Sequence, residues 1–509
     1  EFFFFFFEER RAGIKGFVGK GDYFSVVPLD NRDYGKQCKP PLQPERRGKH
    51  FGAGVASNYI FNWVNNVAKE VRKKYPDKYI ASIAYADMFE PPDFDMEPNV
   101  AICVCMADGW DGYGMNILKA WTKKVSRVFL WEYHYPVGHF PLVYPHKVAK
   151  YIQEIHKLGV KGMFMEMGDM NSALYHINYY IISKALVENN FNVDKALSEY
   201  YRRFYGPAEK PMKKFWSIIE NARTVEKTRY NSATGSCLYK DWEILGSKER
   251  MKKLETALRR AESLVKTEPF ISRIRIIRTG VMAYLKKQKA KHEKIVSMPT
   301  KILHVKKITG KIILDGKLDD SCWQTAETSS PFVTLQNSRA ERKTTVKAIY
   351  DNKNLYFGFY CEEPYMKSLH LTQRTSVPGL CTDDSVEFTL DIGRKIKDYI
   401  HVMMNANGLI WYRWCGKYAQ NKLPDLHIQG KTYKGKNFWS AEFIVPFEKI
   451  TDGVPPESGA VWGANFMRNC YTPLKWKYNE RSGARWTAWS PTFATGYHII
   501  DRFGKLIFE

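Results

Sequence analysis

The sequence of 509 residues lacks any apolar run of about 18 residues, which argues against a membrane-spanning helix. It also lacks cysteine pairs with zinc-ligand spacing, although it contains nine cysteines. Cys103 and Cys105 lie two apart in an apolar run and would share one strand face, as small core residues do. Neither an initiator Met nor a basic leader precedes the Phe2–Phe7 tract. We therefore expect the chain to begin inside a longer protein.

Positive charge is in excess, because the sequence has 78 Lys and Arg against 54 Asp and Glu, which gives a net charge of +24. Such a balance favours anionic partners, such as uronate-containing glycans or nucleic acids. The densest basic run, residues 248–294, carries no nucleic-acid motif, and its apolar residues recur at helical spacing. This spacing indicates a solvated helix face, so a nucleic-acid partner is disfavoured and an acidic glycan stays open. The spaced apolar residues are Met251, Leu254, Leu258, Ala261 and Val265.

Aromatic residues are abundant, with 14 Trp, 31 Tyr and 30 Phe. Most of these rings fill β cores. An excess also suits sugar binding, because flat rings stack on the C–H faces of pyranoses while polar tips reach hydroxyls.

Residues 1–171 alternate short apolar runs with amphipathic helices, a β-α-β pattern that predicts a parallel sheet. Five strands are visible, whereas a closed (β/α)8 TIM-type barrel has eight. We expect a partial barrel whose N-terminal strands lie upstream; a small open α/β sheet is the alternative. The predicted strands are Tyr23–Leu29, Tyr79–Tyr85, Val100–Cys105, Val128–Trp131 and Gly162–Met165.

Downstream the pattern changes twice, so the chain is expected to be multidomain. Residues 172–297 read as a helical extension, and residues 306–509 read as an all-β sandwich with short strands bounded by Gly, Asp and Asn. The predicted sandwich strands include Thr345–Tyr350, Leu355–Cys361, Ser385–Leu390, His401–Met404 and Trp439–Val445.

Carboxylates follow the predicted parallel strands, at the rim where barrel enzymes hold their catalytic groups. Glu132 and Glu166 end consecutive strands and are the predicted catalytic pair, because glycoside hydrolysis needs a carboxylic acid and a carboxylate. Either a retaining or an inverting separation is open, and so is a structural role in ion pairs. The predicted substrate-binding residues at this rim are Asp30, Tyr85, Asp87, Trp110, Trp131, Tyr133 and His134.

The segment Tyr23–Tyr205 resembles the barrel family catalogued as domain of unknown function 4838. The resemblance rests on VVPLDNRDYGKQC, SNYIFNWVNNVAKEVRKKYPDKYIASIAY, FLWEYHYPV, GVKGMFMEMG and EYYRRFYGPA. It implies a glycoside-hydrolase-like barrel related to α-glucuronidase and hexosaminidase barrels, fused to sugar-binding modules in secreted polysaccharide degraders. It does not supply the catalytic residues.

The region from Ile308 to Phe508 resembles family 9 carbohydrate-binding modules. The resemblance rests on ILDGKLDDSCW, TTVKAIYDNKNLYFGFYCEEP, DDSVEFTLD, VMMNANG, FWSAEFIVPFEKI, VWGANFMRN and WTAWSP. It implies a sugar held between aromatic rings and a structural calcium, for which Asp315 and either Asp319 or Asp320 would donate oxygens.

The chain departs from this family where a Trp of the sugar clamp is expected, because Leu380 and Cys381 stand there. Trp411 and Trp414, three apart on one strand, should face opposite sides, so that one could replace the missing ring. The predicted sugar contacts of the module are therefore Trp411, Trp414, Arg468, Trp486 and Trp489.

Together these features predict a secreted, extracellular or periplasmic, carbohydrate-active protein. We expect a glycoside hydrolase acting on polysaccharide or uronate-containing glycan, with no required cofactor; the alternative is a non-catalytic glycan-binding protein with an inactive barrel. We expect this chain to be inactive without upstream strands, because an unclosed barrel leaves an incomplete rim. The oligomeric state stays open.

Overall fold

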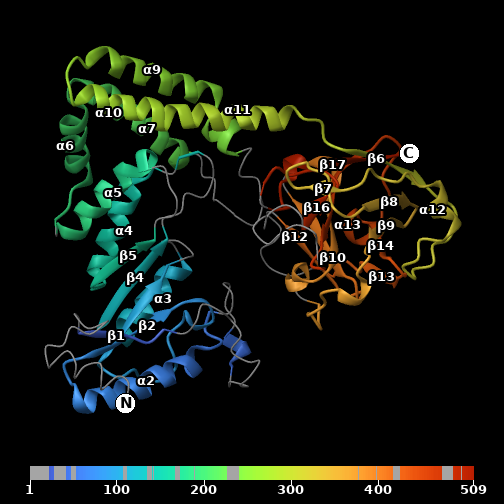
Figure 1. Ribbon diagram of the computed structural model, residues 1–509, viewed down its shortest axis with the longest axis horizontal. Helices are drawn as coiled ribbons and strands as arrows, with labels where there is room; N and C mark the ends of the chain where they lie inside the picture. The colour runs from blue at the N-terminus through green and yellow to red at the C-terminus, as the bar shows by residue number, and fades with distance from the viewer. Residues whose placement is uncertain are drawn as a thin grey trace. The chain divides into compact units, whose positions relative to one another are not determined.

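The computed structural model describes residues 22–27, 42–46, 53–106, 112–133, 140–141, 143–166, 172–188, 190–225, 240–376, 378–396, 398–415, 425–472, 485–494 and 496–509. The chain divides into two compact units (Figure 1). Unit 1 comprises residues 1–226 and 249–284, and unit 2 comprises residues 227–248 and 285–509.

Within the described ranges, every helix is too short or too polar to cross a bilayer.

Unit 1 is built around a five-stranded parallel sheet whose strands lie side by side in chain order. Helices α2 (Ser57–Lys74), α3 (Tyr113–Lys124) and α4 (Pro145–Lys157) connect successive strands, which confirms the predicted β-α-β pattern. Sequential parallel order is the arrangement of a barrel segment, but closure into a barrel stays a prediction. The strands are β1 (Tyr23–Ser25), β2 (Tyr79–Ala84), β3 (Val100–Cys105), β4 (Arg127–Tyr133) and β5 (Gly162–Glu166).

The two faces of this sheet differ in burial because successive side chains point to opposite sides. One face, here the helix face, packs against the connecting helices and buries Ile80, Ile102, Val104, Val128 and Leu130. The other, here the aromatic face, is less buried, and the Phe164 side chain is 53% exposed. The aromatic face carries Tyr23, Tyr79, Phe129, Trp131, Tyr133 and Phe164.

The helical part of unit 1 follows the sheet along the chain. Trp216 of α7 donates its indole N–H to the Tyr205 hydroxyl at 2.9 Å inside this packing. The predicted amphipathic helix is confirmed as α9, which buries Met251, Leu254 and Leu258 and leaves its Lys and Arg side chains exposed, except for the half-buried Arg250. The helices are α5 (Ser172–Val187), α6 (Val193–Tyr205), α7 (Glu209–Val225), α9 (Lys248–Leu264) and α10 (Phe270–Ile276); α11 (Ala283–Ser297) belongs to unit 2 from residue 285 onward.

Unit 2 is a β-sandwich. One layer contains β12-β11-β10-β15-β17, the other contains β8-β9-β14-β13, and β6 bonds to β17 along its first four residues and to β8 along its last two. The predicted all-β unit is thus confirmed. Its strands are β6 (Ile302–Lys307), β7 (Val333–Thr334), β8 (Thr344–Tyr350), β9 (Asn354–Glu362), β10 (Ser385–Asp391), β11 (Tyr399–Asn405), β12 (Ile410–Cys415), β13 (Gln429–Lys434), β14 (Phe438–Pro446), β15 (Val461–Asn469), β16 (Trp486–Ala488) and β17 (Gly504–Phe508).

Aromatic rings from both layers interlock in the sandwich core. Phe388 of β10 lies 4.8 Å from Phe357 of β9 and 5.2 Å from Phe443 of β14, measured between ring centroids. Phe466 of β15 lies 5.1 Å from Phe357. These fully buried rings fix which side of each strand faces inward, and therefore which side chains stand on the outside.

Two glycines with the same backbone angle provide a matched stability test. Gly316 and Gly459 both have φ of +87°, which costs other residues about 1–2 kcal/mol. A Cβ on Gly316 would lie 2.6 Å from the Thr432 carbonyl carbon, whereas a Cβ on Gly459 would meet nothing within 4 Å. Urea unfolding of the full chain should therefore show that Gly316→Ala lowers the free energy of unfolding by about 2 kcal/mol more than Gly459→Ala. Equal losses would show that the close approach to Thr432 is wrong.

Candidate functional site

Glu132 and Glu166 end neighbouring strands, as predicted, but the pairing register puts them on opposite faces. Glu132 is level with Met165, and Tyr133 is level with Glu166. Glu132 lies on the helix face, is only 3% exposed, and accepts a hydrogen bond from the Tyr151 hydroxyl of α4. A catalytic pair must flank the glycosidic bond that is cleaved. Glu132 and Glu166 lie on opposite faces of the sheet, so they do not form such a pair.

Glu166 shares the aromatic face with several rings. Its carboxylate accepts a hydrogen bond from the Trp131 indole N–H at 3.0 Å, and the Trp131 and Phe164 ring centroids are 4.5 Å apart. Tyr133 and Cys105 are hydrogen-bonded beside it, and burial raises the pKa of both groups. The arrangement is one carboxylate on an aromatic surface, with neutral hydroxyl and thiol neighbours.

The remaining predicted rim residues fall into two groups. Tyr85 follows β2 and lies close enough to Tyr133 to add to the raised pKa of that phenol. Asp87 lies in a 3-10 turn, Ala86–Met88, whose Asp87 carbonyl accepts the Ala56 amide at 2.7 Å. The other predicted contacts, Asp30, Trp110 and His134, lie outside the described residues.

Unit 2 has a polar layer on the side of β10, β11, β12 and β15 that faces away from the core, here called the outer face, and apart from Arg413 its side chains are buried. The register aligns alternate residues of these strands across the layer. An antiparallel sheet commonly has one face on the core and one face in water, and the water-facing side is polar. Here the second face is also polar, and it includes several aromatic rings. The outer face comprises Ser385, Glu387, Thr389, Asp391, Tyr399, His401, Met403, Asn405, Trp411, Arg413, Cys415, Asn465, Met467 and Asn469.

Glu387 is the centre of a hydrogen-bond network on the outer face. Its two oxygens lie 2.6 Å from Nε2 of His401 and 2.5 Å from Nδ2 of Asn469. Asn469 also bonds to Oγ of Ser385 at 2.9 Å and accepts from the Tyr497 hydroxyl at 3.1 Å. Burial alone would raise the pKa of Glu387, but the His401 and Asn469 interactions bring this pKa below its usual value. The buried carboxylate is therefore held ionised.

A half-exposed rim stands next to this network. It consists of Tyr471, Arg485 and Trp486, of which Arg485 is exposed and the two rings are partly buried. Trp486 is level with Asn469, and the Arg485 guanidinium lies 5.5 Å from the Tyr471 ring centroid. The Tyr471 amide donates to Asp384 at 2.9 Å, which fixes the backbone of the rim.

Trp411 and Trp414 face opposite sides of β12, as their spacing predicted. Trp414 packs on the main core, whereas Trp411 lies on the outer face with Leu380 and Met403. Leu380, at the position of the missing family Trp, is fully buried in that small cluster. Trp411 is 8% exposed, so it supports the outer face more than it offers a free ring.

Two other predicted sugar contacts lie inside the sandwich. Trp489 is fully buried, with its ring 5.4 Å from Phe466. Arg468 is 1% exposed and donates to the Glu362 carbonyl at 2.8 Å and to Glu363 at 3.1 Å. Neither side chain has a surface that a sugar could reach, so we correct the prediction and leave both out of the site.

The aspartates predicted to hold calcium make local bonds. Asp315 is 2.9 Å from the Lys317 ammonium, which, with the Lys317 amide, lowers the Asp315 pKa. Asp320 accepts the Ile313 amide at 3.0 Å. These oxygens bond to a lysine and to a backbone turn, and neither of the two groups of potential metal ligands found in the described residues includes Asp315, Asp319 or Asp320. A structural calcium stays a prediction.

The sequence interpretation missed Glu387, His401 and Asn469. A usable signal was present in Ser385–Leu390, where polar and apolar residues alternate and thereby place Ser385 and Glu387 on one non-core face. The partners of Glu387 come from β11 and β15, and no local pattern links those strands to β10.

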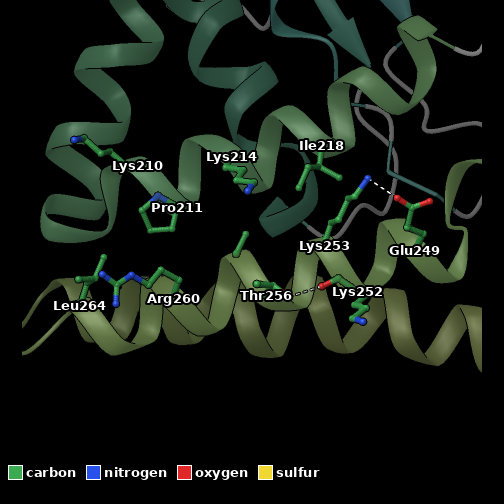
Figure 2. A pocket seen from close by; sticks show the side chains of 11 residues that line it. Lys210, Pro211, Lys214, Ile218, Glu249, Lys252, Lys253, Thr256, Arg260 and Leu264 are labelled. Atoms are coloured by element: carbon green, nitrogen blue, oxygen red, sulfur yellow. Dashed lines mark hydrogen bonds and ion pairs between the residues drawn. The ribbon is translucent and has the colours of Figure 1, made fainter.

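A second surface feature is a basic groove of about 870 Å³ between α7 and α9 (Figure 2). Its lining includes Lys210, Lys214, Lys252, Lys253 and Arg260, and Glu249 pairs with Lys253 at 2.6 Å. The lining contains no aromatic ring. Exposed cations on a helix are usually a solvated face, so we place the candidate site in unit 2, at the rim beside the Glu387 network.

The ionised state of Glu387 gives a prediction for acid stability. Because its folded-state pKa lies below the usual 4.5, its contribution to stability is complete above that value and is lost as the pH falls through the folded pKa. Urea unfolding of the full chain between about pH 5 and about pH 3 should show a shallower loss in Glu387→Gln than in the parent. If the free energy of unfolding falls equally steeply with pH in the parent and in Glu387→Gln, Glu387 is not ionised in the folded protein.

Comparisons with known proteins give partial matches. The search of curated proteins finds no match to this chain. Among solved structures, a family 9 carbohydrate-binding module from Caldicellulosiruptor kristjanssonii in complex with cellotriose is 19% identical, with a TM-score of 0.31, and the match covers 41% of this chain and 94% of that one. The complex of such a module with glucose, from the same organism, is 18% identical, with a TM-score of 0.30 and coverage of 41% and 96%.

A candidate carbohydrate-binding protein from Bacteroides uniformis is 16% identical, with a TM-score of 0.34, and the match covers 41% of this chain and 100% of that one. By sequence, residues 18–217 match the family described as Domain of unknown function (DUF4838). The matched residues contain all five strands of the parallel sheet.

Proposed function

We propose that unit 2 binds carbohydrate at the rim formed by Tyr471, Arg485 and Trp486, and so holds the protein on a polysaccharide. The observation that carries this proposal is the position of two half-exposed rings and a cation directly beside the ordered Glu387 network. Aromatic faces with polar edges are what a pyranose needs, because its C–H faces stack and its hydroxyls take hydrogen bonds.

The network under the rim would supply orientation. Asn469 is level with Trp486, and its amide is held by Glu387, Ser385 and Tyr497. A rim fixed in this way loses little side-chain freedom on binding, which favours affinity.

The charge of the rim favours acidic sugars. Arg485 is exposed beside Tyr471, and Arg413 lies on the same outer face. A guanidinium binds a carboxylate through two parallel hydrogen bonds, so a uronate-containing glycan is the proposed ligand class. Attachment to such a polymer acts through effective concentration, and we propose an extracellular or periplasmic location, where the polymer would be.

The rim predicts which tryptophan matters for binding. Trp486→Ala should weaken binding of the full chain to a uronate-containing polysaccharide about 10-fold or more, because a stacking surface of about 1–2 kcal/mol is lost. Isothermal titration of the folded variants measures the effect. Trp63→Ala is the matched control, since Trp63 is 50% exposed on α2 of unit 1, and it should bind as the parent does.

The same titration tests the sugar class. Arg485→Gln should reduce affinity for the acidic polymer while leaving affinity for a neutral one unchanged. Equal binding by parent and Trp486→Ala, or no binding to any glycan, would overturn the proposal.

A second candidate function is cleavage of glycosidic bonds at the end of the parallel sheet. The specific observation is that Glu166 stands on the aromatic face among Trp131, Tyr133 and Phe164, whereas Glu132 is covered by α4. We propose Glu166 as the carboxylate that acts on a bound sugar and Glu132 as a positioning group for β4 and α4. A second acid would then come from another strand end.

These different roles predict that Glu166→Gln and Glu132→Gln change different properties of the protein. If the chain cleaves the glycan, Glu166→Gln should lower kcat by at least about 100-fold, the scale of general acid–base catalysis. Glu132→Gln should keep most of kcat and lose thermal stability instead. Product chromatography after incubation with the bound polysaccharide measures both. Equal kcat in the parent and in Glu166→Gln would contradict the proposed role of Glu166.

A further inference from the structure

Three side chains with metal-binding atoms come together on the outer face of unit 2. His401 is on β11, Cys415 ends β12, and His498 follows β16 along the chain. A nitrogen of each ring and the Cys415 sulfur lie within 4.8 Å of one another. His401 and Cys415 are almost fully buried, and the two histidine rings meet edge to face with centroids 4.7 Å apart.

Each histidine has one nitrogen engaged by an oxygen. Nε2 of His401 lies 2.6 Å from Glu387, and Nδ1 of His498 lies 2.8 Å from the Tyr399 hydroxyl. These bonds leave Nδ1 of His401 and Nε2 of His498 for an ion. Metal-binding histidines commonly have this arrangement, with the second nitrogen bonded to a carboxylate or another oxygen that fixes the ring.

The free nitrogen of His401 is an independent observation. His401 is 4% exposed, and its Nδ1 is buried with no hydrogen-bond partner among the described residues. An unpaired polar atom inside a protein costs free energy and is uncommon. A metal ion would satisfy this atom without moving the backbone of β11.

Charged groups around the cluster are balanced. The negatively charged Glu387 is hydrogen-bonded to His401. The positively charged Arg413 lies on β12, level with His401. Arg413 also lies close to Cys415, whose thiol must lose its proton to bind a metal ion. A divalent ion would add its charge to two anions and one cation.

We propose that His401, Cys415 and His498 form a binding site for a transition-metal ion, with Zn²⁺ as the preferred ion. Two imidazoles and a thiolate suit Zn²⁺ and exclude Ca²⁺ and Mg²⁺, which take oxygen ligands. In a tetrahedral zinc site the ligand atoms are about 3.5 Å apart, so side-chain rotations would bring the three ligand atoms, now within 4.8 Å of one another, to the spacing that the ion requires. The fourth position would take water. The ion would tie the segment around His498 to the β11 and β12 strands.

A second group in the same unit does not fit a metal. Glu363, Asp384 and Cys470 also have their ligand atoms within 4.8 Å. However, Glu363 accepts bonds from Arg342, Arg468 and Thr472, and Asp384 accepts two backbone amides. Two guanidinium groups already neutralise this site, so it is an internal ion-pair network.

The test is Zn²⁺ titration of the metal-free full chain under reducing conditions. We expect one tight equivalent, and Cys415→Ser should weaken it by about 100-fold or more because the thiolate ligand is lost. Cys381→Ser is the matched control, since Cys381 is a half-buried thiol of the same unit outside the cluster, and it should bind as the parent does. Co²⁺ should give a thiolate charge-transfer absorption in the parent and in Cys381→Ser, but not in Cys415→Ser.

A measurement on the unaltered chain covers the case in which Cys415→Ser fails to fold. Bound Zn²⁺ should slow alkylation of Cys415, followed by peptide mass spectrometry, and should leave the alkylation rate of Cys381 unchanged. Absence of a tight equivalent, equal affinity in Cys415→Ser, or equal labelling of Cys415 with and without Zn²⁺ would overturn the proposal.

Discussion

Strand β10 lies between β11 and β15, and its register with them decides which side chains of this layer face the core and which face the other way. Its register sends Val386, Phe388 and Leu390 into the core and Ser385 and Glu387 to the outer face. A shift of one residue would exchange these sets, burying a carboxylate among phenylalanines. The core and the outer face are therefore specified together, because the rings that hold the layers together also orient the polar network.

The same alternation explains the outcome for the parallel sheet. Existence and order of its strands could be predicted because apolar runs and helical spacing are local patterns. The pairing of Glu132 with Glu166 could not, because it depends on which residue of β4 lies level with which residue of β5. The separation of Trp411 from Trp414 was predictable, since two residues on one strand need no partner to fix their faces.

The sequence also could not show which individual large side chains are buried in the fold. Trp489 and Arg468 occur in segments rich in aromatic and polar residues, which also suit a sugar site. Arg468 is instead buried because Glu363 and a backbone carbonyl, more than a hundred positions away in sequence, complete its hydrogen bonds. Likewise, His401, Cys415 and His498 lie on separate segments, and only tertiary packing brings their nitrogen and sulfur atoms together.

Strand β6 has a mechanical consequence. Residues 302–305 bond in parallel to β17, and residues 306–307 bond in parallel to β8, so the first strand of the sandwich is shared by both layers. A pull applied to the chain before β6 acts along the strand, and the ladder bonds resist it together in shear. A strand joined only at its end would instead be peeled away one bond at a time. A protein held on a polymer through the rim would thus carry tension along a strand that both layers hold in shear.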